Sequence, residues 1–94
     1  MSNAPLNFDN VEALRKHMLL TMTQMAKLLA VSRVTYAGWV KNKPIRKGND
    51  SNVRAVLRKV MRVMTEQEWP SPDVIAMPSA QRFDYLVELM SKDE

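Results

Sequence analysis

The sequence contains no cysteine and a single histidine, His17, among its 94 residues. Without thiols the chain can form neither a disulfide framework nor a thiolate metal site, and one imidazole cannot build a multi-histidine site. No carboxylate pair or nucleophile–base combination stands at a fixed helical spacing within an apolar stretch. We therefore expect no metal, no cofactor and no enzymatic activity.

Long apolar runs are also missing. No stretch approaches the roughly 20 residues that a membrane span needs, and no secretory signal is visible. We therefore expect a cytoplasmic protein without membrane contact. The length is sufficient for one small domain with a modest core.

Acidic residues are scarce in the first two thirds of the chain. Residues 1–64 carry twelve Lys and Arg against three acids, whereas residues 65–94 carry two basic residues against seven acids. A basic body predicts a polyanionic partner, and an acidic C-terminal part predicts a different role. The alternative is that these charges only keep a small helical protein solvated.

Apolar residues recur at helical spacing in five segments, and no strand is clearly indicated. We predict helices over residues 10–19, 22–29, 33–41, 52–64 and 80–91. Asp9 with Glu12 is expected to cap the first, Asp50 or Ser51 the fourth, and Ser79 the last.

Prolines separate the last two of these helices. Pro70, Pro72 and Pro78 exclude a long helix between residues 65 and 78. Pro72 is well placed to open a short helix that runs through Met77, because proline suits the first helical position. A short strand over residues 74–77 is the alternative.

The second and third predicted helices lie almost end to end. Thr21 caps the former, with Gln24 as its capping-box partner, and Ser32 caps the latter. Only Ala30 and Val31 separate the two patterns. Helices joined by so short a turn cross at a steep angle, which is the geometry of a helix-turn-helix.

Eight residues of this segment fit one known pattern in register, and they are Leu20, Thr21, Ala26, Leu29, Val31, Ser32, Thr35 and Trp39. They make the segment resemble the helix-turn-helix of the Cro/CI/XRE family of phage and bacterial regulators. Met25 stands for the family's usual leucine, and Tyr36 for its isoleucine or valine. The resemblance implies an all-α, lambda-repressor-like bundle of four to five helices over residues 8–64, followed by a C-terminal helical extension.

Two positions depart from the family pattern. Ala30 stands where the family often has glycine, which reaches positive φ without steric cost. Ala30 must therefore tolerate strain or use a different turn. Met22 replaces a glutamine that often grips the DNA backbone, so Thr23 or Gln24 would have to supply that contact.

The resemblance also implies which residues meet DNA. The second motif helix of this fold class lies in the major groove. Arg33 could donate two hydrogen bonds to guanine, and Val34 could contact a thymine methyl. Arg33 could instead be solvated or bind a phosphate, and Gly38 could admit the groove floor or pack against a helix. The base-reading candidates are Arg33, Val34, Thr35, Ala37 and Gly38.

A second group of residues is expected to hold the DNA backbone. Such contacts fix the register and supply affinity that depends on salt. The lysines could alternatively serve only solubility, and the basic face of the fourth helix could flank DNA or pair with the acidic part. Tyr36 and Trp39 are expected in the core. The backbone candidates are Thr23, Gln24, Ser32, Lys41, Asn42, Lys43, Arg46 and Lys47.

Residues 65–94 form a connector and an amphipathic helix. One helix-turn-helix reads few bases, and such proteins bind as dimers with half-sites about 34 Å apart. We therefore predict that this part forms a homodimer interface, although the helix could instead fold back onto its own domain. The predicted interface residues are Trp69, Phe83, Leu86, Val87 and Met90.

The sequence thus favours a regulator of transcription that binds specific double-stranded DNA. The predicted type is a small dimeric repressor from a phage or plasmid. A different class is an antitoxin or adaptor-type module whose C-terminal helix binds a partner protein. A nonspecific nucleoid binder is a third hypothesis, which Arg33 and Val34 at the reading positions disfavour.

Overall fold

The computed structural model describes residues 5–92, and in that range it contains helices and no strand. The all-α prediction is confirmed. Asp93 and Glu94, counted above in the acidic part, lie outside the described residues, as do residues 1–4. The helices are α1 (Phe8–His17), α2 (Met22–Leu28), α3 (Arg33–Val40), α4 (Lys47–Glu66), α5 (Pro72–Ala76) and α6 (Ser79–Ser91).

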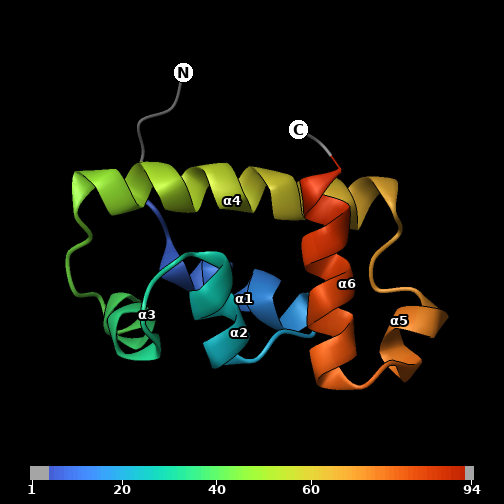
Figure 1. Ribbon diagram of the computed structural model, residues 1–94. Coiled ribbons are helices and arrows are strands. Elements are labelled where there is room, and N and C mark those ends of the chain that lie inside the picture. Colours follow the sequence, from blue (N-terminus) through green and yellow to red (C-terminus); the bar gives the residue numbers. More distant parts are fainter. Residues whose placement is uncertain (1–4, 93–94) are drawn as a thin grey trace.

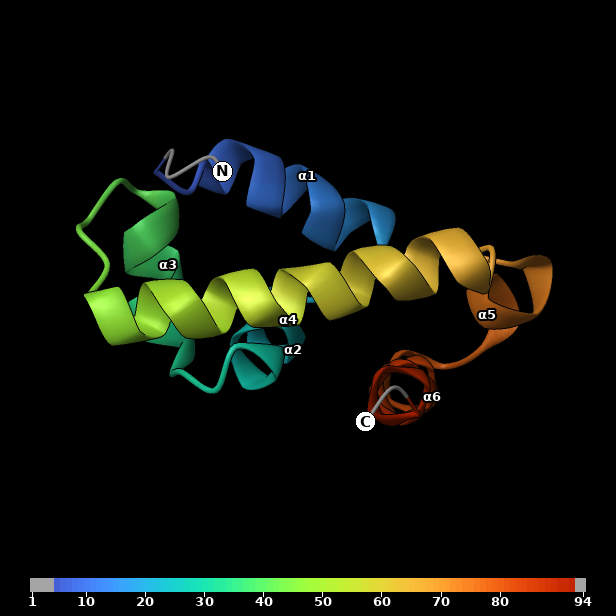
Figure 2. The ribbon, with the colours of Figure 1, turned by 90° about the horizontal axis from the view of Figure 1, so that it is seen from above.

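Helix α4 is the longest element, and the others are arranged around it (Figure 1). Its 20 residues span about 30 Å. Seen from above, α1 lies on one side of α4, and α2 and α6 lie on the other (Figure 2). Helix α3 lies at the N-terminal end of α4, whereas α5 lies at its C-terminal end. Helix α3 and the C-terminal connector therefore occupy different ends of the molecule.

One hydrophobic core joins all six helices. Tyr36 and Trp39 are both buried, as their spacing on the third predicted helix indicated. Burial of a large apolar side chain contributes about 1.5–3 kcal/mol, so this shared core is the main source of stability. Among its buried members are Val11, Met25, Tyr36, Trp39, Val53, Val60, Val63, Val74 and Leu86.

Four helices end in the left-handed conformation on residues other than glycine. The φ angles are 64° at Leu19, 59° at Ala30, 72° at Asn42 and 52° at Glu68. Neither glycine has positive φ. In each case the next amide donates to a carbonyl five residues back, as in Val31 to Ala26 at 3.0 Å. This hydrogen bond is the mark of a Schellman motif. Ala30 thus tolerates positive φ within the turn that glycine would otherwise form.

Several predicted boundaries are wrong. Helix α1 begins at Phe8, because Asn7 rather than Asp9 caps it: the Asn7 Oδ1 accepts from two backbone amides at 2.9 and 3.3 Å. Helix α4 begins at Lys47, five residues earlier than predicted, so Gly48 lies inside it. Helix α6 follows Pro78 without a side-chain cap, and Ser79 is its first helical residue.

The connector contains the short helix α5. The Ser71 hydroxyl accepts from the amide of Val74 at 3.3 Å, and Pro72 occupies the first turn. The alternative of a strand over residues 74–77 is therefore wrong. None of the helices within residues 5–92 is both long and apolar enough to span a bilayer.

The C-terminal part packs against its own domain. Trp69 is only 3% exposed, and its indole Nε1 donates to the carbonyl of Met18 at 3.0 Å. Its ring stacks on Tyr85 with centroids 6.0 Å apart, and Leu86 of α6 is fully buried. The prediction that Trp69 and Leu86 form an exposed dimer face does not fit this burial. An aromatic or leucine on an amphipathic stripe is equally suited to the monomer's core.

Candidate nucleic-acid interface

Helices α2 and α3 pack against each other, and each begins at its predicted cap. The Thr21 hydroxyl accepts from the amide of Gln24, and the Gln24 Oε1 accepts from the amide of Thr21, both at 3.0 Å. The Ser32 hydroxyl accepts from the amide of Thr35 at 3.1 Å. These caps satisfy amides that would otherwise lack partners at the start of each helix. The predicted capping box is therefore confirmed.

A polar network fixes the inner side of α3 to α1. The Arg15 guanidinium donates to both oxygens of Glu12 at 2.7 and 3.0 Å, and the Tyr36 hydroxyl donates to the same carboxylate. Arg15 also donates to the carbonyl of Leu20 at 2.8 Å. Glu12 therefore does not complete a capping box, which was its predicted role. A sequence pattern does not reveal this contact, since Glu12 and Tyr36 lie 24 residues apart.

The protonation states of this network are well separated. The hydrogen-bonded Arg15 guanidinium holds the pKa of Glu12 below its ordinary value. Burial raises the pKa of Tyr36, and the neighbouring Glu12 carboxylate raises it further. Around neutral pH the network therefore contains a charged carboxylate, a charged guanidinium and a protonated phenol. These groups hold α3 in a fixed orientation on α1.

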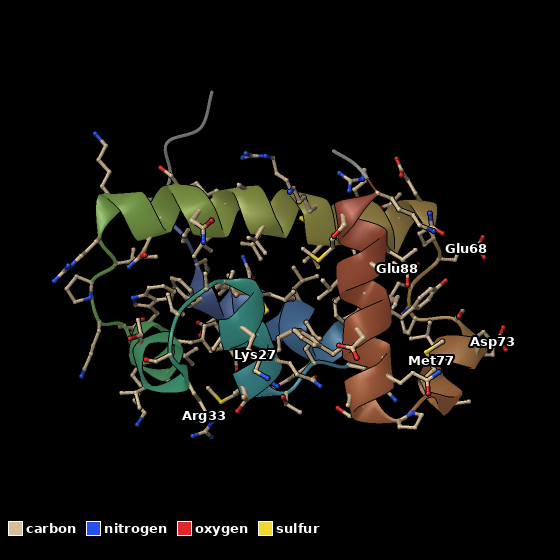
Figure 3. The ribbon with its side chains drawn as sticks, viewed as in Figure 1. Lys27, Arg33, Glu68, Asp73, Met77 and Glu88 are labelled. Atoms are coloured by element: carbon tan, nitrogen blue, oxygen red, sulfur yellow. The ribbon has the colours of Figure 1, made fainter. Side chains whose placement is uncertain are left out.

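The outer side of α3 carries the predicted base-reading residues. Val34 is 80% exposed, and Arg33 and Thr35 are exposed beside it. Arg33 extends away from the molecule on the side opposite α4 (Figure 3). Ala37 and Gly38 are half-buried one turn later. A guanidinium and an isopropyl group are thus presented together at the first turn of a rigidly held helix.

Exposed cations surround this end of the molecule. Four exposed cations lie in the loop and at the start of α4: Lys41, Lys43, Arg46 and Lys47. Like Arg33, they form no ion pair with an acid among residues 5–92. Asn42 lies exposed within the same loop, residues 41–46. Uncompensated positive charge at close spacing attracts a polyanion.

Two arginines of α4 differ from the cations of the loop, because each lies close to an acid of the same helix. Arg54 pairs with Asp50 at 2.6 Å, and Arg62 approaches Glu66 at 3.8 Å. Both pairs lie along the helix itself. Glu66 belongs to the acidic part of the sequence and Asp50 does not, so the predicted pairing with that part is realised here by Arg62. Glu68 and Asp73 lie at the far end of the molecule from Arg33 (Figure 3). The charge asymmetry of the sequence is therefore also an asymmetry in space.

Gln24 is already engaged within the protein. Its Nε2 donates to the carbonyl and the hydroxyl oxygen of Ser79 at 3.2 and 3.0 Å, while its Oε1 completes the capping box. A phosphate contact from Gln24 would have to replace these bonds. Thr23 and Ser32 are exposed, although the Ser32 hydroxyl already donates to Thr35 at 2.9 Å. Thr23 is thus the exposed side chain near Met22 for which no such internal hydrogen bond is seen among residues 5–92.

Gly38 contacts the loop that follows α3 and does not pack against another helix. A Cβ added there would lie 3.1 Å from the Cδ of Lys43, and the amide of Lys43 donates to the carbonyl of Gly38 at 2.9 Å. The space left by the absent side chain is therefore filled by the stem of Lys43.

Arg82 links α6 to the connector and to the turn between α1 and α2. Its guanidinium donates to the carbonyls of Val74 and Met77 at 3.0 and 2.8 Å, and to that of Leu19 at 3.4 Å. A further bond reaches Ile75 at 3.1 Å. Sequence reasoning missed this residue, because backbone carbonyls leave no trace in the pattern of side chains.

No cluster of three or more metal-ligating side chains occurs in the part of the chain that the structure describes. No protein family model, curated protein or solved structure matches the chain.

Proposed function

We propose that this chain is a transcriptional regulator that binds specific double-stranded DNA and places α3 in the major groove. The observation that carries the proposal is the two-sided character of α3. Its inner side is fixed by Tyr36 and Trp39, while its outer side presents Arg33 and Val34 among cations without acidic partners. A major groove admits one α-helix, and such side chains suit the edges of guanine and thymine.

The mode of action is occupancy of an operator without a cofactor, as in a small repressor of the lambda-repressor-like type. The loop 41–46 and the start of α4 would supply phosphate contacts through Lys41, Arg46 and Lys47. Rigid attachment of α3 supports base reading over nonspecific nucleoid binding, because a reading helix must keep its orientation.

A second copy of the chain is the partner that the outer side of α6 suits. Val87 is 39% exposed in an apolar groove between α2, α4 and α6, whose lining includes Leu28, Val56 and Phe83. Lys27 borders this groove on α2, and Glu88 follows Val87 on α6 (Figure 3). They form no ion pair within the described chain.

A two-fold interface could pair these charges between copies, because it brings each patch against itself. Three of the predicted interface residues line this groove and would then contribute to the dimer contact: Phe83, Val87 and Met90. An adaptor that binds a different protein would use the same groove, and the experiments below distinguish these cases.

Arg33→Ala tests the base-reading role. We expect a loss of about 1–3 kcal/mol on the preferred duplex and a relaxed preference at one base pair. Lys47→Ala serves as the comparison, because loss of a phosphate contact weakens all sequences alike and lowers the salt slope by about one. Equal weakening of specific and random DNA by Arg33→Ala would contradict the base-reading assignment.

Sedimentation velocity tests the dimer. Glu88→Lys and Lys27→Glu should each weaken self-association, because each places like charges opposite each other. The double exchange should restore it, and Val87→Glu should abolish it. A monomeric wild-type protein over the micromolar range would instead support the adaptor hypothesis.

A further inference from the structure

Gly38 forms a notch in the surface of α3, and the side chain of Lys43 fills it. The Cδ of Lys43 would lie 3.1 Å from a Cβ at position 38, and its Cβ and Cγ would lie 3.8 Å away. The backbone does not require glycine here, since Gly38 has no positive φ. The notch is therefore needed for the neighbouring side chain rather than for the helix.

Lys43 shares this side of α3 with a base-facing residue. The same shallow hollow is lined by Val34 and Thr35 from the first turn of α3, by Gly38 and Lys43, and by Pro44 of the loop. The lysine stem thus lies against α3, and the side chain is exposed overall. A lysine can rest its methylene groups on a surface while its ammonium reaches a polar partner.

We propose that Lys43 reads a base edge, and that Gly38 is the positioning residue that lays the lysine along α3. This inference rests on the proposed function and changes the role of Lys43 from backbone contact to base contact. A lysine ammonium has donors only. Guanine offers it two adjacent acceptors, O6 and N7, whereas adenine N7 stands beside an amino donor, thymine O4 beside a methyl group, and cytosine presents the N4 donor, so guanine is the best match. The target is a guanine close to the base pair that Val34 contacts.

The test uses two duplexes: one enriched from a random pool by the wild-type protein, and one of shuffled sequence with the same composition. Lys43→Ala should lower affinity for the enriched duplex by about 5- to 100-fold and affect the shuffled duplex much less. Lys47→Ala should lower both by a similar factor. Equal loss on both duplexes with Lys43→Ala, with a salt slope reduced by about one, would overturn the inference.

Gly38→Ala probes the notch without removing a charge. The new methyl must push the Lys43 stem aside, so the ratio of the two affinities should fall by roughly threefold or more. The salt slope should stay unchanged, and the substitution should cause no further loss in a Lys43→Ala background. The matched control is Gly48→Ala, because a Cβ at position 48 has no neighbour within 4 Å.

Both glycine substitutions lie in helices and raise helix propensity, so thermal unfolding should show neither variant to be less stable than the wild type. Lost selectivity in a protein of undiminished stability would support a positioning role. Unchanged selectivity of Gly38→Ala would overturn it. A wild-type protein without preference between the duplexes would instead refute the proposed function, and this outcome is visible before any variant is measured.

Discussion

Ala30 is the residue at which the turn of the helix-turn-helix stores strain. Its φ of 59° lies in the left-handed region, which costs an L-residue about 1–2 kcal/mol relative to glycine. Its methyl group is exposed, so removing it sacrifices little packing. Glycine also loses more chain entropy on folding, which offsets about 0.4–1 kcal/mol of the gain. We therefore expect Ala30→Gly to stabilise the protein by about 0.5–1 kcal/mol, or roughly 2–8 °C in Tm.

Urea unfolding followed by far-UV circular dichroism measures this difference. Ala13→Gly is the matched control, because Ala13 is exposed within α1, where glycine should cost about 0.5–1 kcal/mol. The same chemical change should thus have opposite signs at the two positions. Destabilisation by Ala30→Gly similar to that of Ala13→Gly would show that the turn carries no such strain.

Three further substitutions probe contacts that hold α3 and the C-terminal part in place. The folded-state pKa of Glu12 is lowered, so its contribution to stability is present above its ordinary pKa of 4.5 and is lost as pH falls through the folded value. Glu12→Gln should therefore lower the free energy of unfolding at pH 7. It should also reduce the fall of that free energy between neutral and acidic pH, as measured by urea titrations. Trp69→Phe should lower the free energy of unfolding in urea by about 1–3 kcal/mol, because the carbonyl of Met18 loses its indole donor. An unchanged midpoint would show that this hydrogen bond does not contribute to stability. Arg82→Lys should lower the Tm by several degrees, since one ammonium cannot reach all the carbonyls that the guanidinium binds. A variant as stable as the wild type would show that these hydrogen bonds do not stabilise the C-terminal part.

Local signals predicted the helices α2 and α3 and their caps well. Thr21 and Ser32 cap the helices where expected, because a cap depends on a hydroxyl and an amide only a few residues apart. The inward positions of Tyr36 and Trp39 follow from helical spacing alone. The acidic cap of α1 was misplaced because Asn7 competes with Asp9 for the same role.

Contacts between distant residues were beyond such reasoning. Three hydrogen bonds join different parts of the chain, and no periodic pattern of the sequence predicts them. They connect Tyr36 to Glu12, Gln24 to Ser79, and Arg82 to Leu19. An apolar stripe also does not state what each of its residues packs against: Leu86 of the C-terminal helix lies in the chain's own core, whereas Val87 is exposed. The role of Gly38 became visible only once Lys43 was placed beside it.

Selection of bound sites from a random duplex pool tests the central proposal most directly. The pool should be incubated with the full chain at moderate salt, and the enriched sequences determined after several rounds. We expect one enriched motif that contains guanine beside thymine, repeated as a palindrome with half-sites about 34 Å apart. A pool that remains random although the protein binds it would contradict sequence-specific recognition by α3.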